Sequence, residues 1–272
     1  MTTRTLRTEQ LERLVSMETI RAPRISHWQD IKTFLIPYLG QWIDSDKDRV
    51  VDQYGDIVDE TGLHALEIYE AGMMTLRSSP ANPWFKYGTP DQDLNRHPPV
   101  AKWFRTADEM ARLIFRKSNT NLTLPHHYSE GGAFGTSASI MVEDPDTIIH
   151  HHRLTAGQFV LAIDGRDRVD TLYRKFSMSI MQLIKEFGIE NVSKQVRATY
   201  NDGRGPIDQQ ITVIHAIEPR IDRDPMRRDN LNMPWGSIYF EHDAGPDETL
   251  REGGHMRFPA LTPRFPVMGG EI

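Results

Sequence analysis

The spacing of apolar residues changes at Gly135, and this change constrains the fold more than any other feature of the chain. Before Gly135, apolar side chains recur every three or four residues, which places them on one face of a helix. After Gly135 come short runs rich in Ile, Val, Leu, Phe and Tyr, separated by turn sequences, which is typical of strands. The sequence therefore predicts an α+β fold.

Five helices are expected in the first half. Periodic apolar residues predict helices over residues 5–20, 25–38, 63–76 and 100–114, and a fifth opens at Asn119 or Asn121. Ser26 is a candidate cap for the second of these helices, separating it from the first. Residues 80–99 hold five prolines and are expected to form a loop.

The second half is expected to be mainly β-structure. Residues 137–143, 159–164 and 169–177 predict a strand meander, and two short helices follow at 178–187 and 192–200. Residues 211–217 and 235–241 predict two further strands, paired with each other. Because the remainder of residues 203–272 is rich in Pro, Gly and Arg, we expect this region to form a small β module on its own lobe.

Composition excludes several classes of protein. The 272 residues include no cysteine, which rules out disulfide scaffolds, Cys-ligated zinc, iron–sulfur clusters and thiol catalysis. No stretch reaches the ~18 apolar residues of a membrane span, and the N-terminus lacks the continuous apolar region of a signal peptide. A net charge of −6 argues against nonspecific coating of nucleic acid, although it leaves room for a local basic patch.

Two histidine clusters suggest one possible chemistry. His126 and His127 are adjacent, and His150, His151 and His152 follow each other, so imidazoles from two elements could converge on a metal, with Glu130 and Asp144 to complete the site. The spacing does not place two histidines on one helical face, which favours ordinary hydrogen bonds. A metal-dependent hydrolase is therefore the alternative function, while the favoured interpretation is a chain with no cofactor and no catalytic residues.

Two further patterns have a structural and a functional interpretation. The glycine-rich segment 131–137 runs from a helix into a strand and lacks a Gly-Lys-Ser/Thr ending, so it predicts a turn with positive φ rather than a phosphate-binding loop. Four basic residues lie on or beside the two short helices before residue 203 and could face DNA phosphates, although a solvated helix face is the default expectation. These candidate DNA contacts are Lys185, Lys194, Arg197 and Arg204.

Many short segments, taken in order, resemble the head-to-tail connecting proteins, the portal proteins of short-tailed, podovirus-type bacteriophages. No single segment is specific, but their order extends along nearly the whole chain. The segments are residues 34–39 (FLIPYL), 58–66 (VDETGLHAL), 71–74 (AGMM), 76–80 (LRSSP), 84–85 (WF), 117–119 (KSN), 134–138 (FGTSA), 142–144 (VED), 169–176 (VDTLYRKF), 182–183 (QL), 187–188 (FG), 215–220 (HAIEPR), 252–254 (EGG) and 258–259 (FP).

The resemblance implies a structural protein of the virion and not an enzyme. Portal subunits form a ring, usually a dodecamer, at one capsid vertex, and double-stranded DNA passes through the ring during packaging and ejection. The implied partners are other copies of the chain, terminase, the tail adaptor, and scaffold and capsid proteins, with no membrane involved. Assembly in the host cytoplasm agrees with the absence of cysteine.

The resemblance also implies a division of the chain. Residues 1–178 would form a wing, residues 179–202 stem-proximal helices, and residues 203–272 a clip-like β module. Family members are much longer than this chain, so we expect it to cover only the N-terminal half to two-thirds of a portal. Arg264-Phe265 stands where an Arg-Trp pair is more usual.

Overall fold

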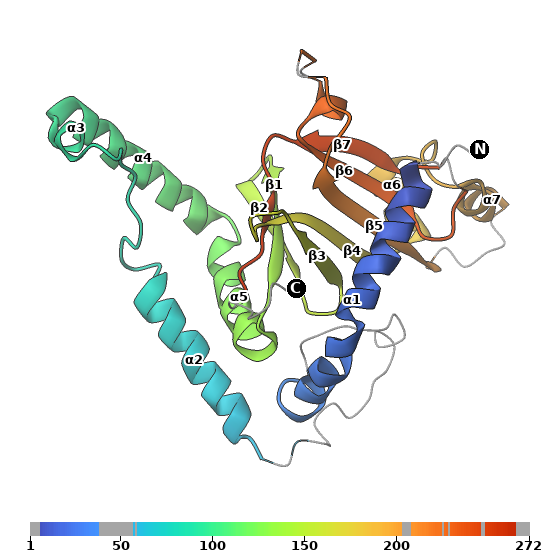
Figure 1. Ribbon diagram of the computed structural model, residues 1–272, viewed down its shortest axis with the longest axis horizontal. Coiled ribbons are helices and arrows are strands. Elements are labelled where there is room, and N and C mark those ends of the chain that lie inside the picture. The colour runs from blue at the N-terminus through green and yellow to red at the C-terminus, as the bar shows by residue number, and fades with distance from the viewer. Residues whose placement is uncertain are drawn as a thin grey trace.

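The computed structural model describes residues 6–37, 57, 59–202, 208–224, 226–227, 229–245 and 248–264. Within these residues, two antiparallel sheets pack together, one long helix crosses the larger sheet, and a helical arm extends to one side (Figure 1). The predicted α+β class is therefore confirmed. Candidate Arg204 and the chain end beyond residue 264 lie outside the described residues.

Helix α1 (Leu6–Phe34) is continuous where the sequence predicted two helices. Pro23 lies inside it and removes one intrahelical hydrogen bond. Contacts on both sides of Pro23 hold the helix together. Leu14 packs on the larger sheet, whereas Trp28 packs against α2 and α5. Ser26 is consequently an interior helical residue, and its predicted role as a cap is wrong.

The larger sheet has five antiparallel strands in the order β3 (Phe159–Ile163), β4 (Val169–Ser179), β5 (Gln210–Pro219), β6 (Trp235–Glu241) and β7 (Arg251–His255). Strands β4 and β5 pair from Leu172–Ile217 to Ser179–Gln210. The expectation of a separate β lobe after residue 203 is therefore wrong. The reason lies in β5, which is apolar on both faces and must be covered on both, so it takes the centre of the sheet.

Each face of the five-stranded sheet has its own cover. Helix α1 covers the face that carries Tyr173, Ile214 and Phe240. On the opposite face, α6 (Ile180–Phe187) and α7 (Lys194–Asp202) cover one end around Val213. The other end packs against a three-stranded sheet, which has the order β2 (Ile148–Leu154), β1 (Ala138–Asp144) and β8 (Ala260–Leu261).

The remaining helices form the arm. It comprises α2 (Thr61–Arg77), the short α3 (Gln92–Arg96), α4 (Pro98–Lys117) and α5 (Thr120–Phe134). Helix α2 packs on α5 so closely that a Cβ added at Gly132 would lie 2.9 Å from the Tyr69 ring. Helices α3 and α4 extend away from both sheets (Figure 1).

Most predicted elements are confirmed within a few residues. The expected meander is wrong in one respect, because the strand over 137–143 lies in the three-stranded sheet whereas the strands over 159–164 and 169–177 pair in the five-stranded sheet. Helix α3, inside the proline-rich loop, and strands β2, β7 and β8 were not predicted. None of the described helices combines the length and the apolar character that crossing a membrane requires.

Candidate interaction surfaces

The histidine clusters join elements of the fold. His127 of α5 hydrogen-bonds Ser137 Oγ through Nδ1 at 2.8 Å and Ser139 Oγ through Nε2 at 2.9 Å. His126 Nε2 lies 3.2 Å from the carbonyl oxygen of Leu154. Burial lowers the pKa of His127 from 6.5 to about 4, with the neighbouring imidazoles adding to the effect, so its ring is neutral at pH 7. His127 therefore ties α5 to β1.

The second cluster has equally local partners. His151 Nε2 is 3.0 Å from Thr120 Oγ1, and the rings of His150 and His152 pack edge to face. Asn119 opens α5, as one of the two predicted positions, and its amide pairs with the main chain of His151 through two hydrogen bonds of 2.8 Å. Among the residues that the structure describes, no three His, Asp or Glu side chains are placed to hold a metal ion. The structure thus gives the hydrolase alternative no support.

Glu130, considered above as a metal ligand, is fully buried, and its two carboxylate oxygens accept hydrogen bonds from other parts of the chain. Thr155 Oγ1 donates to Oε1 at 2.5 Å, and the Ala156 backbone N–H donates to Oε2 at 3.0 Å. Burial raises the pKa of Glu130 from 4.5 to about 7 against the opposing effect of these hydrogen bonds. The carboxyl holds the turn between β2 and β3 on α5, and it exchanges a proton near neutral pH.

The glycine-rich segment divides into a helix and a turn. Gly131 and Gly132 belong to α5, and Gly135 ends that helix with φ of 78°. Only glycine adopts this left-handed conformation without strain, so the predicted positive-φ turn is confirmed at Gly135.

The predicted DNA contacts differ in whether their side chains are free to reach phosphate or are already bonded within the protein. Arg197 Nε donates to the carbonyl oxygen of Ile189 at 3.0 Å, and its Nη2 donates to the carbonyls of Glu190 and Val192. Arg197 therefore orders the turn between α6 and α7. The side chains of Lys185 and Lys194 are exposed on the same pair of helices and remain candidates for contact with phosphate.

A polar junction fastens α1 to the larger sheet, and sequence reasoning missed it. Glu218 of β5 accepts from Arg13 Nη1 at 2.6 Å, from the Tyr173 hydroxyl at 2.7 Å and from Gln10 Nε2 at 3.3 Å. Burial raises the pKa of Tyr173, and Glu218 adds to the rise, so Tyr173 remains a donor. A cavity of about 340 Å³ lies beside this junction, and Ile221 of the β5–β6 loop is among the residues that line it.

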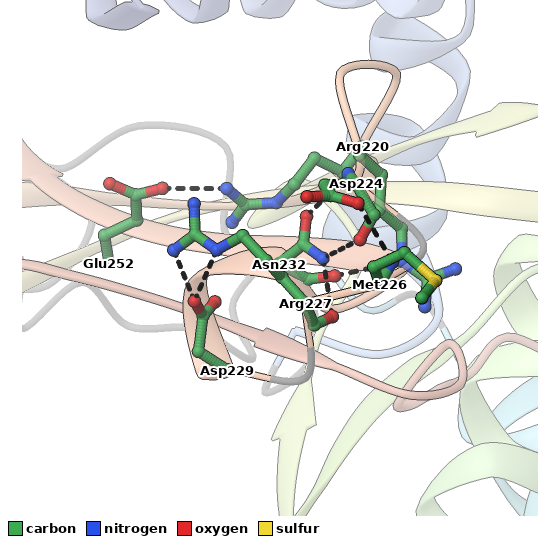
Figure 2. A network of polar contacts seen from close by, with 8 residues as sticks. Arg220, Asp224, Met226, Arg227, Asp229, Asn232 and Glu252 are labelled. Carbon is green, nitrogen blue, oxygen red and sulfur yellow. Dashed lines mark hydrogen bonds and ion pairs between the residues drawn. The ribbon is translucent and has the colours of Figure 1, made fainter.

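The described residues of the β5–β6 loop, which lies beyond the sheet, are joined by polar contacts (Figures 1 and 2). The buried Asn232 side chain accepts from Asp224 N at 3.0 Å and donates to the carbonyls of Asp224 and Arg227. Ion pairs from Arg227 to Asp229, and from Arg220 to Glu252, brace the loop on either side. The loop also presents two apolar side chains, Ile221 and Met226, which are 92% and 90% exposed. We take this pair of exposed side chains as a candidate contact surface.

The comparisons with known proteins agree with a contact role. The family described as "Bacteriophage head to tail connecting protein" matches residues 7–272. The chain belongs to this family. It is 42% identical over 262 residues to the "Probable portal protein" of Bordetella phage BPP-1, and 37% identical over 262 residues to the "Portal protein" of Salmonella phage epsilon15. Each match covers 96% of this chain and 47% of the relative, so the chain spans about half the length of these portal proteins.

For a head-to-tail connecting protein, which contacts other proteins, exposed apolar surface says more about function than the buried histidines do. Besides the β5–β6 loop, the arm exposes large apolar side chains on α2 and on α4. These residues are Ile68 and Leu76 on α2 and Trp103, Met110 and Leu113 on α4.

Proposed function

We propose that this chain forms part of a phage portal subunit that assembles into a ring around double-stranded DNA. The observation that carries the proposal is the match of 96% of the chain to two proteins named as portals, at 42% and 37% identity. The role is structural. The subunit would sit at one capsid vertex of the virion and act by shape, with no cofactor and no bond-breaking chemistry.

The surfaces described above support such a role. A channel for moving DNA should avoid strong binding, because each phosphate that is neutralised releases counterions and adds affinity. A net charge of −6, with Lys185 and Lys194 exposed, suits weak and transient contacts. Residues 179–202, which contain α6 and α7, are our candidate for the stem-proximal region facing the channel.

The division into wing and clip needs one adjustment. Strands on both sides of residue 203 belong to one sheet, so residues 1–178 and 203–272 share a body rather than forming separate lobes. Within residues 203–272, the braced β5–β6 loop is the exposed element that we propose for docking. Its candidate partners are terminase and the tail adaptor, while scaffold and capsid proteins would meet the outer surfaces of the ring.

Native mass spectrometry and negative-stain imaging of the purified chain test this function. We expect one dominant oligomer, with a mass that is a whole multiple of 31.3 kDa, and annular particles with a central hole. Twelve copies would agree with the usual ring of the family. A protein that stays monomeric at every concentration tested would contradict the proposal.

A further inference from the structure

The outward face of α4 carries an apolar seam with the spacing of a helix-packing surface. Trp103, Met110 and Leu113 are 66%, 60% and 52% exposed. With Thr106 and Lys117 they follow intervals of three and four residues, which align side chains along one side of a helix for contact with another helix. The seam, defined as these five residues, has no cover among the described residues.

The other side of α4 already has partners, so the seam is not its attachment to the fold. Phe115 stacks on Trp84 at 6.1 Å between ring centroids, and it also contacts Phe85. The buried Asp108 carboxylate accepts from the backbone N–H of Tyr87 at 2.7 Å. These contacts fix the rotation of α4 about its own axis and leave the seam facing outward.

Helix α2 presents a surface of complementary shape. Ala65, Ile68, Gly72 and Thr75 follow the same three-and-four spacing on the side of α2 that faces away from α5. Three of the four are small, and a Cβ at Gly72 would have no atom within 4 Å. We call these four residues the α2 groove. Small residues between larger ones form the holes that bulky side chains of a facing helix enter.

The net charges of the two helices are of opposite sign. The exposed ionisable residues of α4 are mainly cationic, and those in and just before α2 are mainly anionic. On α4 they are Lys102, Arg105, Arg116 and Lys117 against Glu109, and near α2 they are Asp59, Glu60 and Glu67 against Arg77. Opposite charges at the rim of a contact favour encounter and orientation.

We propose that the α4 seam of one copy packs into the α2 groove of a neighbouring copy. This inference rests on the proposed function, since it supplies a contact between ring subunits. Within one chain, α2 lies against α5 whereas α4 extends away from it, and α2 and α4 do not lie side by side (Figure 1). Among the described residues, each copy therefore leaves one surface of each kind uncovered. Two different surfaces that meet head to tail generate a closed ring when the rotation between copies closes.

The dimensions of the two helices match. At about 1.5 Å of rise per residue, the 20 residues of α4 extend about 30 Å and the 17 residues of α2 about 25 Å. A contact of that length holds Trp103, Met110 and Leu113 against one partner. Trp is one of the residue types that most often anchor protein interfaces.

Site-directed crosslinking tests the contact directly, because the full sequence has no cysteine. Full-length Gly72→Cys and Met110→Cys are purified separately, mixed, and treated with a short bismaleimide. We expect a crosslinked dimer on a denaturing gel that requires both variants. The matched control replaces Met110→Cys with Ala101→Cys, which is exposed on a different side of α4 and should yield at least tenfold less crosslink.

A charge exchange provides a second readout that does not depend on cysteine. Glu67→Lys and Lys102→Glu should each weaken self-association at least tenfold in sedimentation velocity, and a mixture of the two should recover part of the loss. Circular dichroism confirms that both variants fold. Annular particles without the 72–110 crosslink would overturn this contact and leave the portal proposal intact. A wild-type chain that never self-associates would contradict both proposals.

Discussion

The buried carboxyl of Glu130 couples folding to pH, and Glu130→Gln isolates that coupling. Burial raises the pKa of Glu130 in the folded protein from 4.5 to about 7. The folded chain therefore binds this proton more tightly than the unfolded chain. The contribution of Glu130 to stability is complete below about pH 4.5 and is lost as the pH rises through 7, where the buried carboxylate must ionise.

The size of the effect follows from the same shift. Each factor of ten in proton affinity corresponds to about 1.4 kcal/mol, so ionisation of Glu130 costs the folded state on the order of 3 kcal/mol at pH 8 relative to pH 4. Glutamine has nearly the same shape and does not titrate. Its amide oxygen accepts from Ala156 N, and its NH₂ donates to the Thr155 hydroxyl, so both contacts are kept while Thr155 changes from donor to acceptor.

The stability of Glu130→Gln relative to wild type should therefore rise by about 3 kcal/mol between pH 4 and pH 8. Urea unfolding followed by circular dichroism at pH 4, 6 and 8 measures this difference. Glu109→Gln, which removes an exposed carboxyl on α4, serves as the matched control and should show no comparable trend. A difference between Glu130→Gln and wild type that varies by less than about 1 kcal/mol across this range would refute the reasoning.

Three further predictions concern other residues. His127→Ala should lower the free energy of unfolding at pH 7 by about 1–3 kcal/mol, because two buried serine hydroxyls lose their partner. Since the pKa of His127 is held near 4, its contribution to wild-type stability should fade as the pH drops from 6.5 to 4. Thermal melts across that range measure both effects. Tyr173→Phe should cost about 1.5–3 kcal/mol through the lost hydrogen bond to Glu218, and an unchanged urea midpoint would show that the remaining donors suffice. Double replacement of Lys185 and Lys194 by Glu should reduce the salt slope of DNA binding by about 2 in fluorescence anisotropy, whereas an unchanged slope would remove both residues from the channel.

Local structure was predictable where one pattern decides it. The helix over Thr61–Arg77 follows from its periodic apolar residues and from Pro80 after its end, and the strand over Gln210–Pro219 follows from one β-branched apolar run. The positive-φ turn at Gly135 needs only the chemistry of glycine. In these cases the information lies within a few residues of the position that it determines.

The errors arose where distant residues compete with local signals. Ser26 and Pro23 are local signs of a helix boundary, but packing of α1 against the sheet and against α2 and α5 keeps the helix continuous. Asn119 opens α5 as predicted, but no local pattern indicated that its amide would pair with the main chain of His151, more than thirty residues away. Histidines that suggested a metal site found serine, threonine and carbonyl partners in other elements.

The order of residues alone determined most of the helices and strands, the α+β class and the resemblance to a phage connecting protein, because periodicity and short motifs are local properties of a chain. Only the tertiary structure decided that β5 joins β4 in one sheet, and that Trp103, Met110 and Leu113 of α4 and Ile68 of α2 stay exposed among the described residues. A pattern specifies which side of an element is apolar. What covers that side depends on which other elements the folded chain brings against it.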